Sequence, residues 1–167
     1  MKRLFRPLQI LAILLILGIL VGCGLTSKDT GPAKGESVKL KVYAASGLGL
    51  AFSPESGSSW QHYLKTKTNN LADNHLNTLL VLDDNTFWAG TIKGLSLTTD
   101  NAKTWNTYAV DNGLGGNEIN DLAYLNKTIY VGTTGGLSIS TDNAKTWSNI
   151  SLPEGLSSDL ARSVLIE

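Results

Sequence analysis

The chain is poor in residue types that many functions require. Cys23 is the only cysteine among 167 residues, so no disulfide can form within the chain. The longest apolar stretch, residues 8–21, is shorter than the roughly 20 residues of a membrane-spanning helix. After residue 22 the only arginine is Arg162, and no block of basic residues occurs. Nucleic acid is therefore not an expected partner.

Groups with catalytic or metal-binding chemistry are also few. The two histidines, His62 and His75, have no cysteine or second histidine at metal-ligand spacing. No glycine-rich phosphate loop precedes a helix. Glycoside cleavage needs two carboxylates across one bond, and nothing singles out a pair among Glu118, Asp121 and Asp159. We therefore predict no catalytic residue, no metal and no cofactor.

The first residues have the pattern of a secretion signal. Lys2, Arg3 and Arg6 precede the apolar run, which ends in the residues Leu-Val-Gly before Cys23. This ending resembles a bacterial lipobox, which implies a signal helix over 1–22, cleavage before Cys23 and lipidation of its thiol. The partner would then be a membrane, and the location the bacterial cell envelope, facing the periplasm or the exterior. A buried free cysteine in an uncleaved anchor helix is the alternative. Residues 23–37 read as the lipidated cysteine and a flexible tether.

One nineteen-residue unit occurs three times without a gap, at residues 42–60, 87–105 and 129–147. Each copy ends in a tryptophan, and these tryptophans are 45 and 42 residues apart. This period suits one four-stranded propeller blade per repeat. Apolar and polar residues alternate over short runs between turn residues, which is typical of strands. The sequence therefore predicts an all-β propeller over residues 38–167.

The blades are expected at residues 38–75, 76–118 and 119–160, with a further first strand beginning at 161–167. The first blade lacks a recognisable first strand, and residues 161–167 match the openings of the second and third blades. Propellers typically have four to eight blades. We expect either a fragment of a larger propeller, or two copies that associate head to tail into a six-bladed homodimer.

The turn that ends each unit is the most specific motif. Two copies read Thr-Thr-Asp-Asn-Ala-Lys-Thr-Trp and Ser-Thr-Asp-Asn-Ala-Lys-Thr-Trp, and the first copy is looser, with Glu in place of Asp. They resemble the Asp box of BNR repeats. We predict that the carboxylate closes its own turn and that the tryptophan wedges between sheets, rather than a catalytic or calcium-binding role. The residues concerned are Glu55, Trp60, Asp100, Trp105, Asp142 and Trp147.

A second resemblance covers residues 112–137, where NGL is followed by a short apolar strand, VGT and GGL. It is similar to the propeller repeats of bacterial two-component sensors. These resemblances imply a non-enzymatic module that binds, senses or assembles protein or carbohydrate ligands. The alternative is a fragment of a sialidase-like or endo-glucanase-like enzyme that lacks its catalytic blades. A sialidase needs an arginine cluster, which this chain does not have after residue 22.

The expected ligand face lies where the loops between second and third strands, and between blades, gather near the propeller axis. Amide and hydroxyl groups there suit sugars or peptides, although plain solvated loop polarity is the simpler explanation. The residues predicted on this face are Asn77, Asn120, Arg162, Thr91, Lys93, Thr133 and Thr134.

Overall fold

The computed structural model describes residues 39–167, which form one compact unit. The predicted signal peptide, Cys23 and the whole predicted tether lie outside the described residues. Within residues 39–167, no helix is long and apolar enough to cross a membrane.

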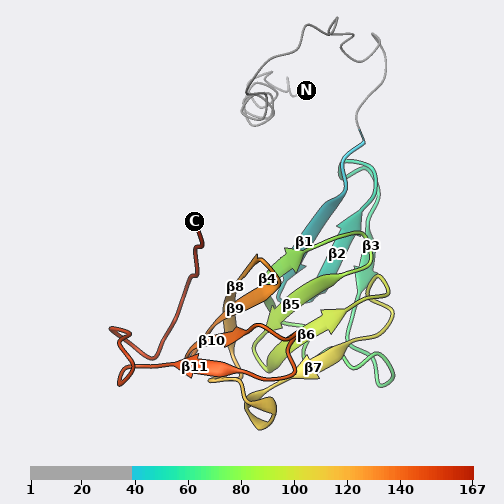
Figure 1. Cartoon of the computed structure of the whole chain (residues 1–167). Coiled ribbons are helices and arrows are strands. Elements are labelled where there is room, and N and C mark those ends of the chain that lie inside the picture. Colours follow the sequence, from blue (N-terminus) through green and yellow to red (C-terminus); the bar gives the residue numbers. More distant parts are fainter. Residues whose placement is uncertain (1–38) are drawn as a thin grey trace, which may run out of the picture. The chain divides into compact units, whose positions relative to one another are not determined.

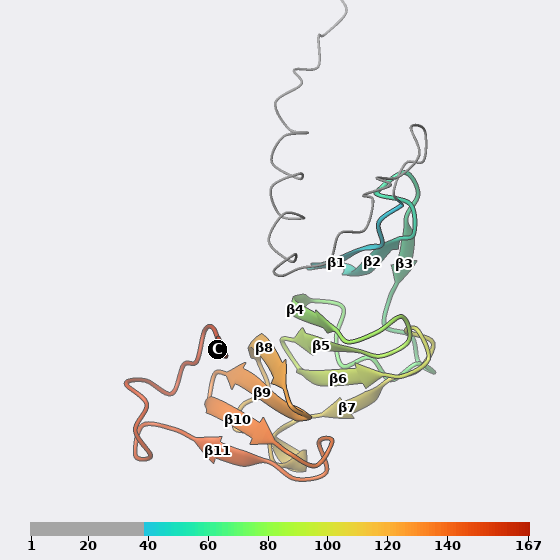
Figure 2. The same cartoon turned by 45° about the horizontal axis from the view of Figure 1, so that its top comes forward.

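Residues 39–167 fold into three antiparallel sheets that succeed one another along the chain (Figures 1 and 2). In each sheet the strands are hydrogen-bonded in chain order. These sheets are three successive propeller blades, as predicted, and the first of them has three strands. The first blade contains β1 (Val42–Ser46), β2 (Gly49–Ser53) and β3 (Gln61–Tyr63). The second contains β4 (Leu76–Val81), β5 (Phe87–Thr91), β6 (Gly94–Thr98) and β7 (Asn106–Tyr108). The third contains β8 (Ile119–Leu125), β9 (Thr128–Thr133), β10 (Gly136–Ser140) and β11 (Ser148–Ile150).

Local sequence explains where the strands begin and end. Asn126 and Lys127 have φ angles of 50° and 67° and make the tight turn between β8 and β9. Gly94 opens β6 with φ of 142°, and a Cβ there would lie 2.6 Å from the Tyr108 carbonyl oxygen. Only glycine fits this position without displacing the neighbouring strand. A short 3-10 helix at Val110–Asn112 leads from the second blade toward the third.

The hydrophobic core lies between neighbouring blades, in two separate clusters. Leu50 of the first blade packs with Leu76, Phe87 and Trp105 of the second. The second cluster, between the second and third blades, includes Trp88, Leu95, Leu114, Ile119, Ile129 and Val131. The second blade therefore buries one face against the first blade and the other against the third.

The tryptophan that ends each repeat packs toward the preceding blade, with one exception. Trp105 shares its buried cluster with Leu50 of the first blade, and the Trp147 ring meets Tyr108 of the second blade at 6.1 Å. Trp60 instead leaves 44% of its surface exposed. The wedge predicted for Trp60 is therefore absent, because no blade precedes it among the described residues.

The end of the chain also differs from expectation. Residues 161–167 carry no strand, although their sequence resembles the openings of β4 and β8. An antiparallel strand needs a partner, and no second strand lies beside this segment within residues 39–167. The segment nevertheless contacts the third blade, through a hydrogen bond from the Ala161 amide to the Thr133 carbonyl.

Candidate functional site

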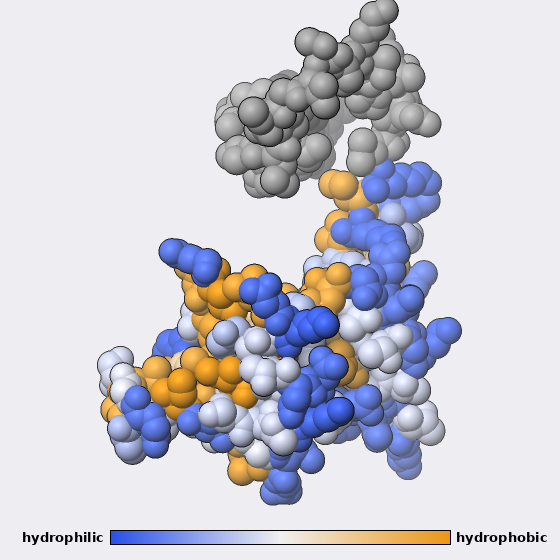
Figure 3. Space-filling view, in the orientation of Figure 1, coloured by the Kyte–Doolittle hydropathy of each residue, from blue (hydrophilic) through white to orange (hydrophobic). Residues whose placement is uncertain are grey.

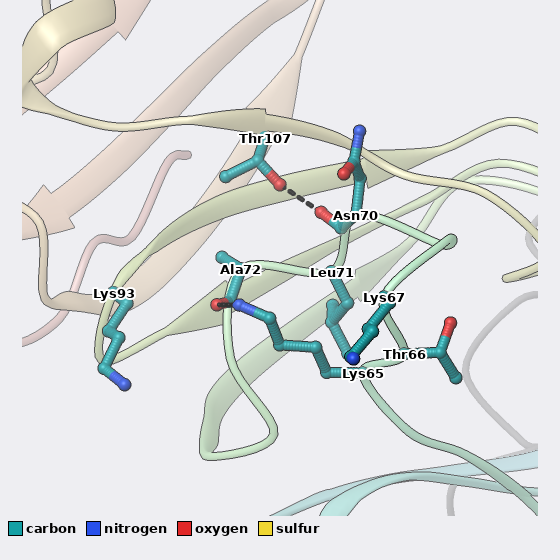
Figure 4. Close-up of a pocket in the computed structure, with 8 residues that line it drawn as sticks. All are labelled: Lys65, Thr66, Lys67, Asn70, Leu71, Ala72, Lys93 and Thr107. Carbon is teal, nitrogen blue, oxygen red and sulfur yellow. Dashed lines mark hydrogen bonds between the residues drawn. The ribbon is translucent and has the colours of Figure 1, made fainter.

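A cavity of about 570 Å³ opens on the side of the second blade where β3 leads into β4 (Figure 4). Most of its lining comes from the connecting segment 64–75, joined by the turn between β5 and β6 and by β7. Three of the lining residues are lysines. The lining residues are Lys65, Thr66, Lys67, Asn70, Leu71, Ala72, Lys93 and Thr107.

The connecting segment is held in shape by its own asparagines. The Asn69 carboxamide oxygen accepts from the amides of Thr66 and Leu71, at 2.9 and 3.3 Å. The Asn74 carboxamide oxygen accepts from the Lys65 amide. Buried Leu71 fixes the segment to the core between the first two blades. The lysines therefore project from a braced loop rather than from a loose one.

Two contacts join this segment to the second blade. The Ala72 amide donates to the buried Ser96 hydroxyl at 3.0 Å, and the Thr107 hydroxyl donates to the Asn70 carbonyl (Figure 4). In the third blade the Gly115 amide likewise donates to the Ser138 hydroxyl at 2.9 Å. The way in which each interblade loop is attached to its blade is thus repeated.

The three lysine ammonium groups differ in their partners. Lys65 Nζ donates to the Ala72 carbonyl, and Lys93 Nζ lies 2.9 Å from an Asp73 carboxylate oxygen. The hydrogen bond from Lys93, with that from the His75 amide, lowers the pKa of Asp73 below its usual value, so this carboxylate stays ionised. Lys67 is exposed and has no hydrogen-bond or ion-pair partner among residues 39–167. The cavity therefore has a net positive charge.

Only Lys93 of the predicted ligand-face residues lines this cavity. Thr91 and Thr133 are fully buried, and their hydroxyls donate to the Gly94 and Gly136 carbonyls, at 2.8 and 2.9 Å. They are therefore turn-closing groups and present no hydroxyl at the surface. Thr134 is exposed but lies outside the cavity.

The other three predicted residues lie along the first-strand positions of the blades. The Asn77 carboxamide nitrogen donates to the Ile119 carbonyl at 3.0 Å, and that of Asn120 donates to the Ala161 carbonyl at 2.9 Å. Both asparagines connect one blade to the segment that follows it. Arg162 is exposed and does not line the cavity.

The turn carboxylates bond within their own turns. The Asp142 carboxylate accepts from the Ser140 hydroxyl at 2.8 Å and from the amide and hydroxyl of Thr146 at 3.0 and 2.6 Å. The Thr146 hydroxyl is the main cause that lowers the pKa of Asp142 to about 2. Asp100 makes equivalent contacts with Thr98 and Thr104.

The first repeat shares one turn contact with the other two and differs in its carboxylate. The Ser53 hydroxyl accepts from the Gly57 amide at 2.8 Å, and the aligned hydroxyls of Thr98 and Ser140 make the same contact. The Glu55 carboxylate pairs with Lys39. The loose match of this copy thus corresponds to a real difference in contacts.

Lys65 and Lys67 are not among the site residues predicted from the sequence. They are two residues apart in one loop, and Lys93 comes from another loop, so no basic block marks them in the sequence. A signal exists in the comparison of interblade loops: the first carries these lysines, whereas the later two carry acids such as Glu118 and Asp159. Aligning the loops by repeat would have shown this contrast.

Other chemistry is sparse in the part of the chain that the structure describes. Residues 39–167 contain no group of three or more histidine, cysteine, aspartate or glutamate side chains that could hold a metal ion. A smaller, more apolar hollow of about 290 Å³ lies between the second and third blades, with Trp88, Leu97 and Tyr124 in its lining.

Comparison with solved structures supports the propeller fold. The chain is similar to an ancestral GH74 enzyme, with 20% identity and a TM-score of 0.55 over 72% of this chain. It is also similar to the extracellular domain of a protein described as a hybrid two-component system from B. thetaiotaomicron, with 19% identity and a TM-score of 0.61 over 72% of this chain. YCF48 bound to D1 peptide matches 68% of this chain, with 18% identity and a TM-score of 0.52.

The chain spans only a small part of these proteins, 17% of the first two and 37% of YCF48. No family model matches the chain, and no curated protein matches it. At these identities the likeness establishes the fold: the described residues are blades of a β-propeller.

Proposed function

We propose that this chain is a non-enzymatic binding module of the propeller type, which takes a negatively charged ligand at the lysine-lined cavity. The observation that carries the proposal is the convergence of Lys65, Lys67 and Lys93 on one cavity of about 570 Å³. That volume lies within the range of about 300–1,000 Å³ typical of ligand sites. Asp73 beside the cavity offsets only one of the three positive charges.

The lysines can contact an anion without losing their present contacts. An ammonium group has three donors, and Lys65 uses one of them on the Ala72 carbonyl. The Lys67 ammonium group makes no hydrogen bond within residues 39–167, so all three of its donors are available to a carboxylate. Asn70 adds polar groups from the same loop. A sugar acid combines such a carboxylate with hydroxyls, so we infer an acidic oligosaccharide as ligand.

The carboxylate contacts favour binding over catalysis. A general acid near neutral pH needs a raised pKa. Burial raises the pKa of Asp121, but hydrogen bonds from the Val164 amide, the Ser163 hydroxyl and the Leu122 amide outweigh it, and the net shift is downward. The pKa of Asp142 is also lowered. Neither group is suited to donate a proton.

Calorimetric titration with short oligogalacturonates tests the ligand proposal, with uncharged oligosaccharides of the same length and an acidic peptide in parallel. Lys67→Gln removes one exposed charge and should weaken oligogalacturonate binding by about three- to tenfold, as expected for the loss of an exposed hydrogen bond worth about 0.7–1.4 kcal/mol. Lys103→Gln is the matched control, because Lys103 is an exposed lysine in the turn at the opposite end of the same blade.

Binding should also weaken as salt increases, since exposed charges are screened within about 8–10 Å at physiological ionic strength. Equal affinity of the Lys67→Gln and Lys103→Gln variants would refute the cavity as the site. Binding of the acidic peptide alone would replace the carbohydrate by a protein ligand at the same lysines.

We further infer that the module is extracytoplasmic and is held at the membrane by lipid on Cys23. The basic start, the apolar run and the Leu-Val-Gly-Cys ending support this. More than one acyl chain gives a stable anchor. Cys23→Ser should abolish palmitate labelling and release the protein from the membrane fraction. Unchanged labelling would contradict the lipoprotein assignment and leave the ligand proposal untouched.

A further inference from the structure

Two parts of the described structure lack the partner that their repeats have. The first blade begins with β1, which aligns with β5 and β9, so residues 39–167 hold no strand there equivalent to β4 or β8. At the other end, residues 161–167 align with the openings of β4 and β8 but have no second strand beside them. The missing strand and the unpaired segment are the same element of the repeat.

The segment 161–167 already stands where a next blade would begin. Asn120 donates its side-chain amide to the Ala161 carbonyl, as Asn77 does to the Ile119 carbonyl of the next blade. The Asp121 carboxylate accepts from the Ser163 hydroxyl at 2.8 Å and from the Val164 amide at 2.9 Å.

Glycines mark the same close approach in both places. A Cβ on Gly90 would lie 2.6 Å from the Ile119 side chain, and a Cβ on Gly132 would lie 3.0 Å from the Ala161 carbonyl oxygen. The third blade thus contacts residues 161–167 in the same way as the second blade contacts β8. The edge of residues 161–167 that faces away from these contacts could pair with a further strand.

The outer face of the third blade also lacks its cover. In the second blade, Trp88 and Leu95 face the third blade and are buried. The aligned residues Tyr130 and Leu137 of the third blade are only partly buried. Figure 3 shows hydrophobic side chains gathered along the C-terminal segment and the neighbouring surface.

The first blade carries an exposed tryptophan that could cover the outer face of a third blade. Trp60 is 44% exposed, whereas the aligned Trp105 packs with Leu50 of the first blade and the aligned Trp147 packs against Tyr108 of the second. In both interfaces between described blades, the face of one blade is covered by the next blade and its tryptophan. Trp60 has no preceding blade to pack against among the described residues.

We propose that a second copy of this chain completes both parts: its β1 pairs antiparallel with residues 161–167, and its Trp60 packs on the outer face of the third blade. Main-chain hydrogen bonds of the added strand would supply affinity, as in other cases of strand addition. The contact made twice would close the three described blades of each copy into one six-bladed ring, within the usual four to eight blades.

The second copy is favoured over the chain's own β1. The second blade separates β1 from the third blade (Figures 1 and 2), and a ring of three blades would be below the usual range. Residues 24–37, or a strand of another protein, are the other occupants that the experiment below must distinguish.

The repeats fix the register of the proposed pairing. Leu79 pairs with Ala89 in the second blade, and Leu122 with Val131 in the third. By alignment, Val164 of one copy would pair with Ala44 of the other. Directly opposed residues are close enough for a disulfide, whereas a shift by one residue points the side chains to opposite faces.

The test uses full chains that carry Cys23→Ser, so that no native thiol interferes. One carries Ala44→Cys with one tag, and the other carries Val164→Cys with a second tag. Co-expression followed by mild oxidation should yield a disulfide-linked pair that contains both tags. The matched control combines Val164→Cys with Tyr43→Cys, one residue out of register, and should yield none.

Further measurements separate the occupants. Light scattering of the Cys23→Ser chain in detergent should give the mass of two copies, and Trp60→Asp should reduce it to one copy. Trp60 is exposed, so circular dichroism of this variant should show an intact fold. A further variant carries Ala44→Cys and Val164→Cys in one chain. A disulfide that forms only within this variant, and never between two chains, would overturn the proposal. A mass of one copy, or equal crosslinking in the offset control, would overturn it as well.

Discussion

The first and second blades are built from the same repeated unit, yet their tryptophans have opposite environments. Trp105 leaves 3% of its surface exposed and Trp60 leaves 44%. Each follows the turn before the last strand of its blade, β3 or β7, so the local sequence does not explain the difference. Of these two, only the second has a blade before it within residues 39–167. The tryptophan therefore gains its burial from its neighbour, as expected where repeats are stabilised by nearest-neighbour interfaces.

The turns themselves differ less than the tryptophans do. Asp100 and Asp142 close their turns by accepting hydrogen bonds, whereas Glu55 pairs with Lys39. The indole nitrogens of Trp105 and Trp147 are buried without a hydrogen-bond partner in residues 39–167, so these rings act by packing. Packing and turn closure can therefore be separated by mutation.

The largest effect should come from removing the buried tryptophan. Trp105→Ala should lower the free energy of unfolding by about 3–5 kcal/mol, because it leaves a cavity between two blades. Trp60→Ala should change the free energy of unfolding by no more than about 0.5 kcal/mol. The same denaturant titration measures it, at a protein concentration at which the chain is monomeric. Similar losses in both variants would mean that the tryptophan stabilises its own turn, which would remove the distinction between the two blades.

A smaller effect should follow from removing the turn carboxylate. Asp142→Ala should lower the thermal midpoint by less than Trp105→Ala does, because the turn is exposed. The matched Glu55→Ala should have less effect again, because the main partner of the Glu55 carboxylate is the exposed Lys39. A loss from Glu55→Ala that equals the loss from Asp142→Ala would show that the first turn depends on its carboxylate as well.

The same carboxylate predicts a pH dependence. The pKa of Asp142 is lowered from 3.8 to about 2 in the folded chain, chiefly by the Thr146 hydroxyl. A lowered pKa contributes stability that is present above the unfolded value and is lost as the pH falls from near 3.8 toward 2. Thermal midpoints across this interval should fall less steeply for Asp142→Asn than for the unaltered chain. Parallel curves would contradict the contribution of this group.

The smallest effect is expected at the alanine of the turn. Ala144 has φ of 62° and is 4% exposed, so its backbone is strained while its methyl group is packed. Ala144→Gly relieves the left-handed strain but loses the methyl contact and adds freedom to the unfolded chain. These terms oppose one another, and the free energy of unfolding should change by less than about 1 kcal/mol. Equilibrium unfolding measures it, and a larger loss would show that the methyl packing dominates.

The blades could be predicted from the sequence because they depend on local, repeated signals. The period of the tryptophans and the alternation of apolar and polar residues predict the strands without knowledge of their neighbours. The cavity could not be predicted in the same way, because Lys93 meets Lys65 and Lys67 only after two loops fold together. Thr91 was assigned to a ligand face because its loop lies there, but its hydroxyl turns inward to the Gly94 carbonyl.

The most direct test of the account is the coupling between Trp147 and Tyr108, whose rings lie 6.1 Å apart across the interface of two blades. A double-mutant cycle of Trp147→Ala and Tyr108→Ala, followed by denaturant unfolding, measures this coupling free of effects confined to either blade. The account predicts a coupling energy of about 0.5–1.5 kcal/mol. Additive losses would contradict it, because the tryptophan of each repeat would then stabilise only its own blade.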